Sequence, residues 1–107
     1  MKGIHFINRR ETDGYRLINL EQSSDEKGVC YSGYWRLDDD DADALVGGRL
    51  YLHETKSQPS AFGGEVLSYS RDGERVKIRF KALAECKGQD WRGHNHAMAY
   101  TSQLIDI

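Results

Sequence analysis

The sequence contains few cysteine and proline residues. Pro59 is the only proline among 107 residues, and Cys30 and Cys86 are the only cysteines. Small secreted domains usually carry a denser disulfide framework, and neither cysteine lies in a CxxC pair, which is the usual spacing of structural zinc ligands. We therefore expect reduced thiols and a cytoplasmic location.

Long hydrophobic segments are also missing. No apolar run approaches the roughly 20 residues of a transmembrane helix. The N-terminal apolar stretch is short and is followed at once by Asn8-Arg9-Arg10-Glu11, so we expect no signal peptide. With 38% hydrophobic and 30% charged residues, the composition is that of a globular protein, and residues 1–107 fit a single domain without membrane contact.

The net charge of −2 argues against a broadly basic nucleic-acid-binding protein. The charges are unevenly distributed, however. From Arg71 to Arg92 there are seven Lys or Arg and four Asp or Glu, whereas Asp38–Asp43 holds five aspartates and no basic residue. We expect one basic and one acidic region.

Alternating hydrophobicity between glycine pairs predicts a mainly β fold. The clearest strand is 75–82, and Asp72-Gly73 predicts a tight hairpin turn between it and a strand at 65–70. Further strands are predicted at 3–7, 15–20, 29–37, 49–53 and 98–107. In the 29–37 strand, we expect one face to hold Val29, Tyr31, Gly33, Trp35 and Leu37.

One short helix is predicted near 38–46. Asp38 or Asp39 can cap it, the following aspartates favour the positive end of the helix dipole, and Gly47-Gly48 ends it. Its apolar stripe consists of Ala42, Leu45 and Val46. Capping is favoured over metal binding because the aspartates lack an EF-hand spacing.

Six or seven strands and one helix define the predicted fold class. It is mainly β (α+β), either a small, mostly antiparallel β-barrel or a highly curved sheet.

The loop 53–64 is the first candidate site. It follows a strand, and loops held between strands often carry function. Its donors could contact an anion or a base edge, Phe62 could stack on the ligand, and Gly63-Gly64 could let it approach the backbone. The candidate donors are His53, Lys56, Ser57 and Ser60. The alternative is a polar crossover loop whose glycines form a bulge.

The loop 90–100 is the second candidate site, with Trp91, Arg92 and His94 as ligand-binding residues. His94 and His96 share a face in an extended chain and could bind a metal with His53 or Cys86. No third ligand lies nearby in the sequence, so we assign no metal and no cofactor. The alternative is a structural corner in which the indole covers the open end of the sheet.

A basic strand face is the third candidate. Arg75, Lys77, Arg79 and Lys81 recur at alternate positions, a spacing that suits contact with a phosphate backbone. The alternatives are a solvated face or protection of an edge strand.

The order of helix, glycine pair, strand, polar loop, glycine pair and hairpin resembles the PUA-like superfamily of small β-barrels, including ASCH and EVE domains. The segments that carry the resemblance are 45–53, 64–67 and 76–80. Lys56-Ser57-Gln58-Pro59-Ser60 also looks like the Lys-Ser-Glu-Pro segment of EVE domains. The resemblance implies binding of RNA or a modified base in a pocket between strands, and it carries over no catalytic residue.

Three functional hypotheses follow. The first is a binding module for nucleic acid or a nucleotide-like ligand, with a pocket between the loops 53–64 and 90–100. The second is a small hydrolase-type enzyme in which His94 or His53 acts as acid or base, with Glu54 and Lys56 nearby. The third is an interaction domain that forms a homodimer through an exposed strand.

Overall fold

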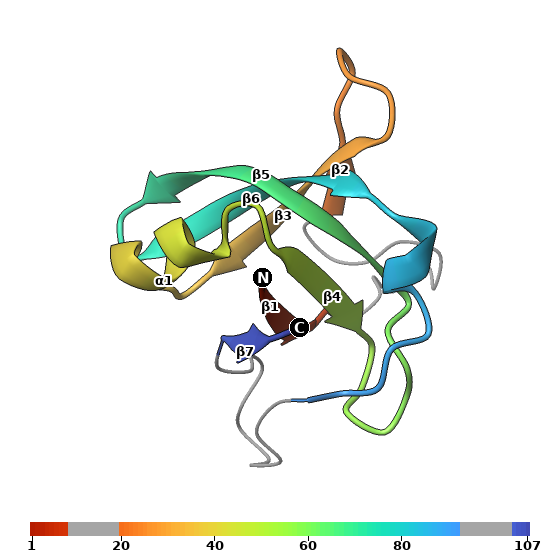
Figure 1. Cartoon of the computed structure of the whole chain (residues 1–107). Coiled ribbons are helices and arrows are strands. Elements are labelled where there is room, and N and C mark those ends of the chain that lie inside the picture. Colours follow the sequence, from red (N-terminus) through yellow and green to blue (C-terminus); the bar gives the residue numbers. More distant parts are fainter. Residues whose placement is uncertain (9–19, 93–103) are drawn as a thin grey trace.

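The computed structural model describes residues 1–8, 20–92 and 104–107. It contains a seven-stranded mixed sheet with the order β2-β3-β6-β5-β4-β1-β7 and one short α-helix (Figure 1). The elements are β1 (Lys2–Ile7), β2 (Leu20–Gln22), β3 (Val29–Trp35), α1 (Asp39–Leu45), β4 (Arg49–His53), β5 (Phe62–Asp72), β6 (Arg75–Ala82), a 3₁₀ turn (Ala84–Cys86) and β7 (Ile105–Asp106). The predicted mainly β class and the single short helix are confirmed.

The sheet is curled but open. In the described residues β2 and β7 are its two edges and do not pair with each other, so of the two predicted arrangements, a barrel or a highly curved sheet, the barrel is wrong. Neighbouring strands are antiparallel except β1 and β4, which pair in parallel. β6 lies between β3 and β5, so its cations do not protect an edge strand.

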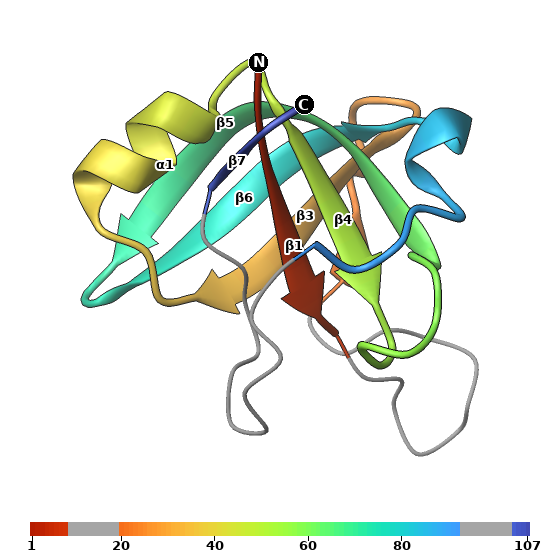
Figure 2. The ribbon, with the colours of Figure 1, turned by 60° about the horizontal axis from the view of Figure 1, so that its bottom comes forward.

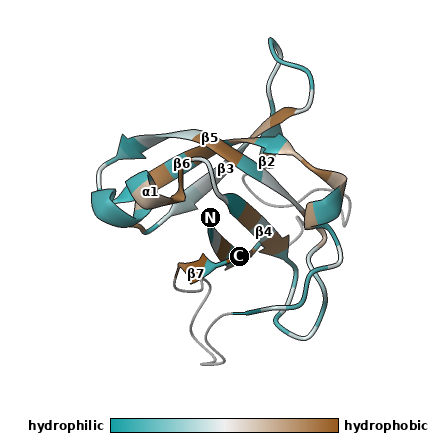
Figure 3. Cartoon of the chain, in the orientation of Figure 1, coloured by the Kyte–Doolittle hydropathy of each residue, from teal (hydrophilic) through white to brown (hydrophobic). Residues whose placement is uncertain are grey.

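The core lies inside the curl. Figures 1 and 2 show β5 and β6 on one side of the molecule and β1 and β4 on the other. Their inward side chains form one buried cluster that includes Phe6, Leu50, Leu52, Ile78 and Phe80. Figure 3 shows hydrophobic and hydrophilic residues alternating along β4, as expected for a strand whose two faces differ.

Two glycines allow β5 to curl between its neighbours. Gly64 pairs with Leu50 of β4 and with Ala82 of β6, at the point where β5 serves both strands. A Cβ atom on Gly64 would lie 1.9 Å from the carbonyl oxygen of Lys81, and one on Gly63 would lie 2.3 Å from that of Leu50. The space beside Gly63 and Gly64, where the sequence predicted that a ligand could approach, is therefore occupied by the backbone of β4 and β6.

The predicted common face of the 29–37 segment is wrong. Cys30 and Ser32 are buried and pair with the core residues Phe80 and Ile78 of β6, while Tyr31 lies opposite Arg79 on the outer face. The pairing register shifts between Ser32 and Trp35, and such an irregularity reverses the alternation of faces. Trp35 can therefore stack on the core residue Phe6, with ring centroids 4.1 Å apart.

The aspartate cluster has the predicted capping role. The side chain of Asp38 accepts a hydrogen bond from the backbone N–H of Asp41 at 2.8 Å. Asp39 forms an ion pair with Arg71 of β5, with 2.6 Å between Asp39 Oδ1 and Arg71 Nε. Of the predicted apolar stripe, Ala42 and Leu45 are buried, whereas Val46 is exposed.

Two other predicted strands fall largely outside the described residues. Of 15–20 only Leu20 is described, and it begins β2. Of 98–107 only residues 104–107 are described, and they contain β7, which pairs with β1.

We predict that Gly64→Ala destabilises the fold by at least about 2 kcal/mol, because the new methyl group would collide with the rigid backbone of β6. Urea denaturation measures this change. Ser70→Ala, at an exposed position of the same strand, is the control and should change stability by less than about 0.5 kcal/mol. Equal stability of the two variants would contradict the close approach at Gly64.

Candidate ligand-binding site

The outer face of the β1–β4 pair carries an unusual set of side chains. His5 lies opposite Tyr51, and Ile7 lies opposite His53, in parallel register. His5 and Tyr51 stack with ring centroids 4.5 Å apart. The exposed fractions of these residues are 1% for His5, 7% for Tyr51 and 0% for His53, so the face that points away from the core is also buried.

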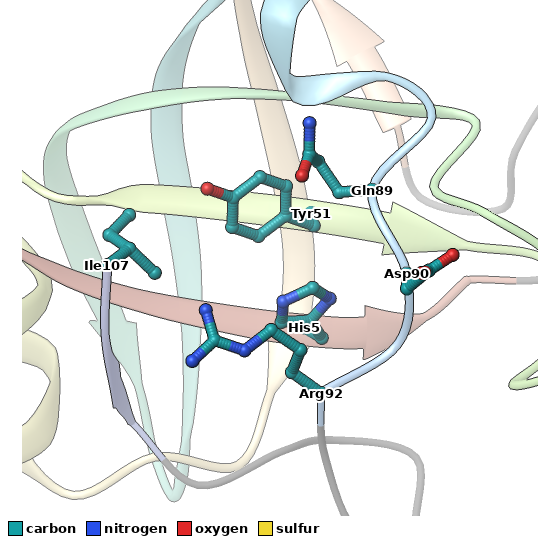
Figure 4. Close-up of a pocket in the computed structure, with 6 residues that line it drawn as sticks. All are labelled: His5, Tyr51, Gln89, Asp90, Arg92 and Ile107. Carbon is teal, nitrogen blue, oxygen red and sulfur yellow. The ribbon is translucent and has the colours of Figure 1, made fainter.

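This outer face is covered by segments from the C-terminal part of the chain. Trp91 meets both histidine rings edge-on, with centroid distances of 5.9 Å to His5 and 5.2 Å to His53. Beside these rings lies a cavity of about 200 Å³. It is lined by His5, Tyr51, Gln89, Asp90, Arg92 and Ile107 (Figure 4).

The polar groups of the cavity are arranged unevenly. Figure 4 shows the Arg92 guanidinium extending beside His5 toward Ile107, and the Tyr51 hydroxyl directed to the same end. The carboxylate of Asp90 points away from these groups. The end of the cavity toward Ile107 therefore combines one cation and one hydroxyl, with the imidazole beside them.

A chain of hydrogen bonds determines the tautomers of the two histidines. His53 Nδ1 lies 3.0 Å from the carbonyl oxygen of Gln58, which can only accept, so Nδ1 carries the proton. A neutral His53 then has an unprotonated Nε2, which lies 2.7 Å from His5 Nδ1. His5 must donate from Nδ1, so a neutral His5 carries its proton on that nitrogen and none on Nε2.

Both histidines are neutral at pH 7. Burial, followed by the nearby His53 and Arg92, lowers the pKa of His5 to about 4. Burial also lowers the pKa of His53, against the opposing effects of the Gln58 carbonyl and Asp90. Burial raises the pKa of the Tyr51 hydroxyl, which therefore stays protonated.

The residues predicted in the 53–64 loop fall into different environments. His53 is buried behind His5, and Lys56 Nζ lies 5.7 Å from the centre of a Trp91 ring. Ser57 is exposed, and its hydroxyl lies 3.0 Å from that of Thr55. Phe62 packs edge-on against the core residue Phe80, with centroids 5.8 Å apart. Phe62 does not line the cavity.

Ser60 joins the two candidate loops. Its hydroxyl donates to the Cys86 carbonyl at 2.6 Å and accepts from the backbone N–H of Gln89 at 3.0 Å. Its backbone N–H and carbonyl bond to Gln89 and Gly88. The buried Ser60 therefore links the 53–64 loop to residues 86–89. These bonds place Gln89 and the residues that follow over β4.

In the second loop, the structure describes residues 90–92. Arg92 lines the cavity and Trp91 packs against His5 and His53, whereas His94 and His96 lie outside the described residues. Within 1–8, 20–92 and 104–107, no group of three His, Cys, Asp or Glu side chains could hold a metal ion. The hydrolase hypothesis uses His53 as an acid or base, but both of its ring nitrogens already contact protein atoms, one in His5 and one in Gln58.

The basic face of β6 is partly neutralised. Lys77 pairs with Glu21 of β2 at 3.4 Å, and Arg79 pairs with Glu26. Arg75 donates to the carbonyl oxygen of Tyr34 at 3.4 Å, and Lys81 is exposed.

The basic face and the cavity point away from each other. The inward residues of β6 and of β1 and β4 belong to one core, so the outer faces of these strands are on opposite sides of it. A ligand small enough for the cavity therefore cannot contact the basic face.

Sequence reasoning missed most of the cavity lining. Tyr51 and His5 lie in the predicted strands 49–53 and 3–7, but nothing in the pattern showed that the two strands are parallel neighbours. Gln89 and Ile107 have no distinctive sequence signal. Of the lining residues, Arg92 was predicted, and Asp90 lies in the same predicted loop 90–100 but was not singled out.

Comparison of the chain with protein-family models, with curated proteins and with solved structures gives no match. The PUA-like resemblance therefore stays a prediction. Both Cys30 and Cys86 are buried free thiols, and burial raises the pKa of each. Among the described residues, no helix is long and apolar enough to cross a membrane.

The histidine pair predicts a pH dependence of stability. The native His5 has a pKa of about 4, below its ordinary value of 6.5, and the pKa of His53 is lowered in the same direction. The unfolded chain therefore binds more protons between these values, and the free energy of unfolding should fall as pH drops. For His5 alone the loss from pH 7 to pH 4 is about 3 kcal/mol.

Urea denaturation across this pH range measures the effect. His5→Gln removes one of the two titrating rings and should flatten the pH profile relative to the parent chain. An unchanged slope in that variant would contradict the burial of a neutral His5.

Proposed function

We propose that this chain is a binding module for a small planar heterocycle, such as a single nucleobase, held in the cavity over β1 and β4. The observation that carries the proposal is the convergence of the Arg92 guanidinium and the Tyr51 hydroxyl beside His5. Binding sites of this kind combine an aromatic lining with a few directed polar groups.

The size of the cavity limits the ligand. Sites for drug-sized molecules typically occupy about 300–1,000 Å³. The volume here is about 200 Å³, which suits one heterocyclic ring better than a nucleotide chain. This role agrees with the base binding that the PUA-like resemblance implies.

Binding is favoured over catalysis by the protonation state of His5. A general base works best when its pKa is near the working pH. The pKa of His5 is about 4, so the imidazole is a weak base at pH 7 and is poorly suited to that role.

The test is an NMR titration of the full chain with uracil, adenine and cytosine. We expect shifts at the indole N–H of Trp91 and the backbone N–H of Arg92. Arg92→Ala should weaken binding about tenfold or more, since hydrogen bonds to charged groups contribute about 1.5–3 kcal/mol. Lys81→Ala removes one positive charge from the opposite face and should leave affinity unchanged.

Two outcomes would contradict the proposal. One is the absence of shifts at the cavity with every base tested. The other is complete displacement of a base by equimolar inorganic phosphate, which would indicate a simple anion site at Arg92.

A second candidate function is contact with single-stranded nucleic acid through the outer face of β3 and β6. The observation that favours it is Lys77, whose Nζ lies 5.3 Å from the ring centre of Tyr31 and 5.8 Å from that of Tyr34. Tyr34 is 41% exposed, and exposed aromatic rings beside cations are typical stacking platforms for bases.

The carboxylates of Glu21 and Glu26 compete with phosphate for Lys77 and Arg79. Neutralising both, in the double variant Glu21→Gln and Glu26→Gln, should therefore tighten binding of a short oligouridine by about three- to tenfold. Fluorescence anisotropy measures the affinity. Asp106→Asn removes a negative charge near β1 and is the control, with no expected gain.

Salt dependence gives the second readout. The affinity of the double variant should fall as salt rises, because phosphate contacts release counterions. An affinity that does not change with salt would exclude phosphate contact on this face.

The fold gives little support to the homodimer hypothesis. The edges of the described sheet are β2, with three residues, and β7, with two, so little edge backbone is available for pairing.

A further inference from the structure

The side chain of Gln89 is held in one orientation beside the cavity. The backbone N–H of Gln89 donates to the Ser60 hydroxyl at 3.0 Å, and its backbone carbonyl accepts from the Ser60 N–H at 2.8 Å. Its side-chain nitrogen Nε2 lies 3.1 Å from the carbonyl oxygen of Glu85 in the 3₁₀ turn. A carbonyl oxygen can only accept, so the amide nitrogen must face Glu85 and the amide oxygen Oε1 must face away from it.

The Oε1 oxygen of Gln89 faces the cavity. Gln89 is one of the lining residues, and Figure 4 shows its nitrogen directed toward the 3₁₀ turn and its oxygen on the side of Tyr51. Three of the four hydrogen-bonding groups of Gln89 are bonded to Ser60 or Glu85. The fourth, Oε1, is bonded to no atom within residues 1–8, 20–92 and 104–107. The cavity therefore has an acceptor whose direction the fold determines.

This acceptor and the cation of the cavity come from opposite sides. Figure 4 shows Gln89 on the β4 side and Arg92 on the β1 side, with the rings of Tyr51 and His5 between them. The guanidinium of Arg92 carries only donors, whereas Oε1 of Gln89 can only accept. A planar ligand that bonds to both residues must therefore offer an acceptor at one edge and a donor at the opposite edge.

We propose that Gln89 is a specificity-determining residue of the cavity, where its Oε1 accepts a hydrogen bond from a ring N–H of the ligand while Arg92 donates to a carbonyl on the opposite side of the same ring. The matching ligand class is a six-membered ring with N–H and C=O at opposite positions. Such a pair occurs in 4-pyridone and in unsubstituted uracil. This inference rests on the proposed base-binding function.

The same arrangement disfavours nucleosides and anions. In uridine the sugar replaces the hydrogen of the ring nitrogen that lies opposite a carbonyl, so the Oε1 oxygen of Gln89 would lose its donor. A phosphate or carboxylate would suit Arg92 but would bring further lone pairs toward Gln89. An acceptor left without a donor costs binding energy, so the expected ligand is a base that carries no sugar.

Three small rings separate these effects. 4-Pyridone has the N–H opposite the carbonyl, 4-pyranone has the same shape with a ring oxygen in place of the N–H, and 2-pyridone has the two groups side by side. We expect a titration of the full chain, followed by NMR, to show 4-pyridone binding about fivefold or more tighter than either of the other two. Uracil should exceed uridine by a similar factor.

Variants test the role of the amide oxygen. Gln89→Met keeps the length of the side chain and the backbone groups that bond to Ser60, but it removes Oε1. The preference for 4-pyridone over 4-pyranone should disappear, while 4-pyranone should bind as it does to the parent chain. Gln22→Met is the matched control, because it makes the same change at an exposed position of β2, an edge strand far from β1 and β4 in the sheet order. The preference should persist in that variant.

A ligand-free measurement keeps the inference falsifiable if Gln89→Met does not fold. In the parent chain, the side-chain amide protons of Gln89 should give nuclear Overhauser contacts to the 3₁₀ turn around Glu85. Contacts from these protons to the ring of Tyr51 instead would show the amide in the opposite orientation and would overturn the inference.

The ligand data distinguish the two levels of the proposal. Equal binding of 4-pyridone and 4-pyranone, an equal loss of both in Gln89→Met, or binding of uracil without binding of 4-pyridone would overturn the role of Gln89 and leave base binding intact. Failure of uracil, adenine and cytosine to bind would overturn both.

Discussion

The parallel pairing of β1 with β4 is the constraint on which the rest of the structure depends. Parallel strands are normally buried on both faces, and this pair has the apolar core on one side and the C-terminal segments on the other. The outer face nevertheless carries two histidines and a tyrosine. Removed from water, these polar groups must bond to protein, and the chain from His5 through His53 to Gln58 does so.

Much of the fold could be predicted from local pattern. The alternation in β6, the Asp72-Gly73 turn and the capped helix depend on neighbours in the sequence, and all three are present. The face of β3 could not be predicted, because the register shift before Trp35 interrupts the alternation without a distinctive residue. The choice between a barrel and a highly curved sheet could not be made from the sequence for a similar reason, since closure depends on how the strands at the two edges pair.

The cavity was predictable only where it uses rare residues in loops. Trp91 and Arg92 were predicted because such side chains are seldom placed together in a polar loop. Arg92 lines the cavity, and Trp91 packs against the His53 ring. His5 and Tyr51 belong to ordinary alternating strands, and their meaning depends on the parallel register and on what covers them. Likewise, cations on β6 that looked available in the sequence have carboxylate neighbours from β2 and the segment after it.

The cavity is lined by residues that lie far apart in the sequence, from His5 to Ile107, and this affects the order of folding. The β5–β6 hairpin closes through a short turn at Gly73, whereas His5 and His53 are 48 positions apart, and Lys2 bonds to Asp106 across 104 positions. Closing a long loop costs the chain conformational entropy before the new contact adds stability, so such contacts form late. A partly folded chain that contains only the hairpin has no cavity. Any ligand of this site therefore binds only the fully assembled chain, and its occupancy would report the last step of folding.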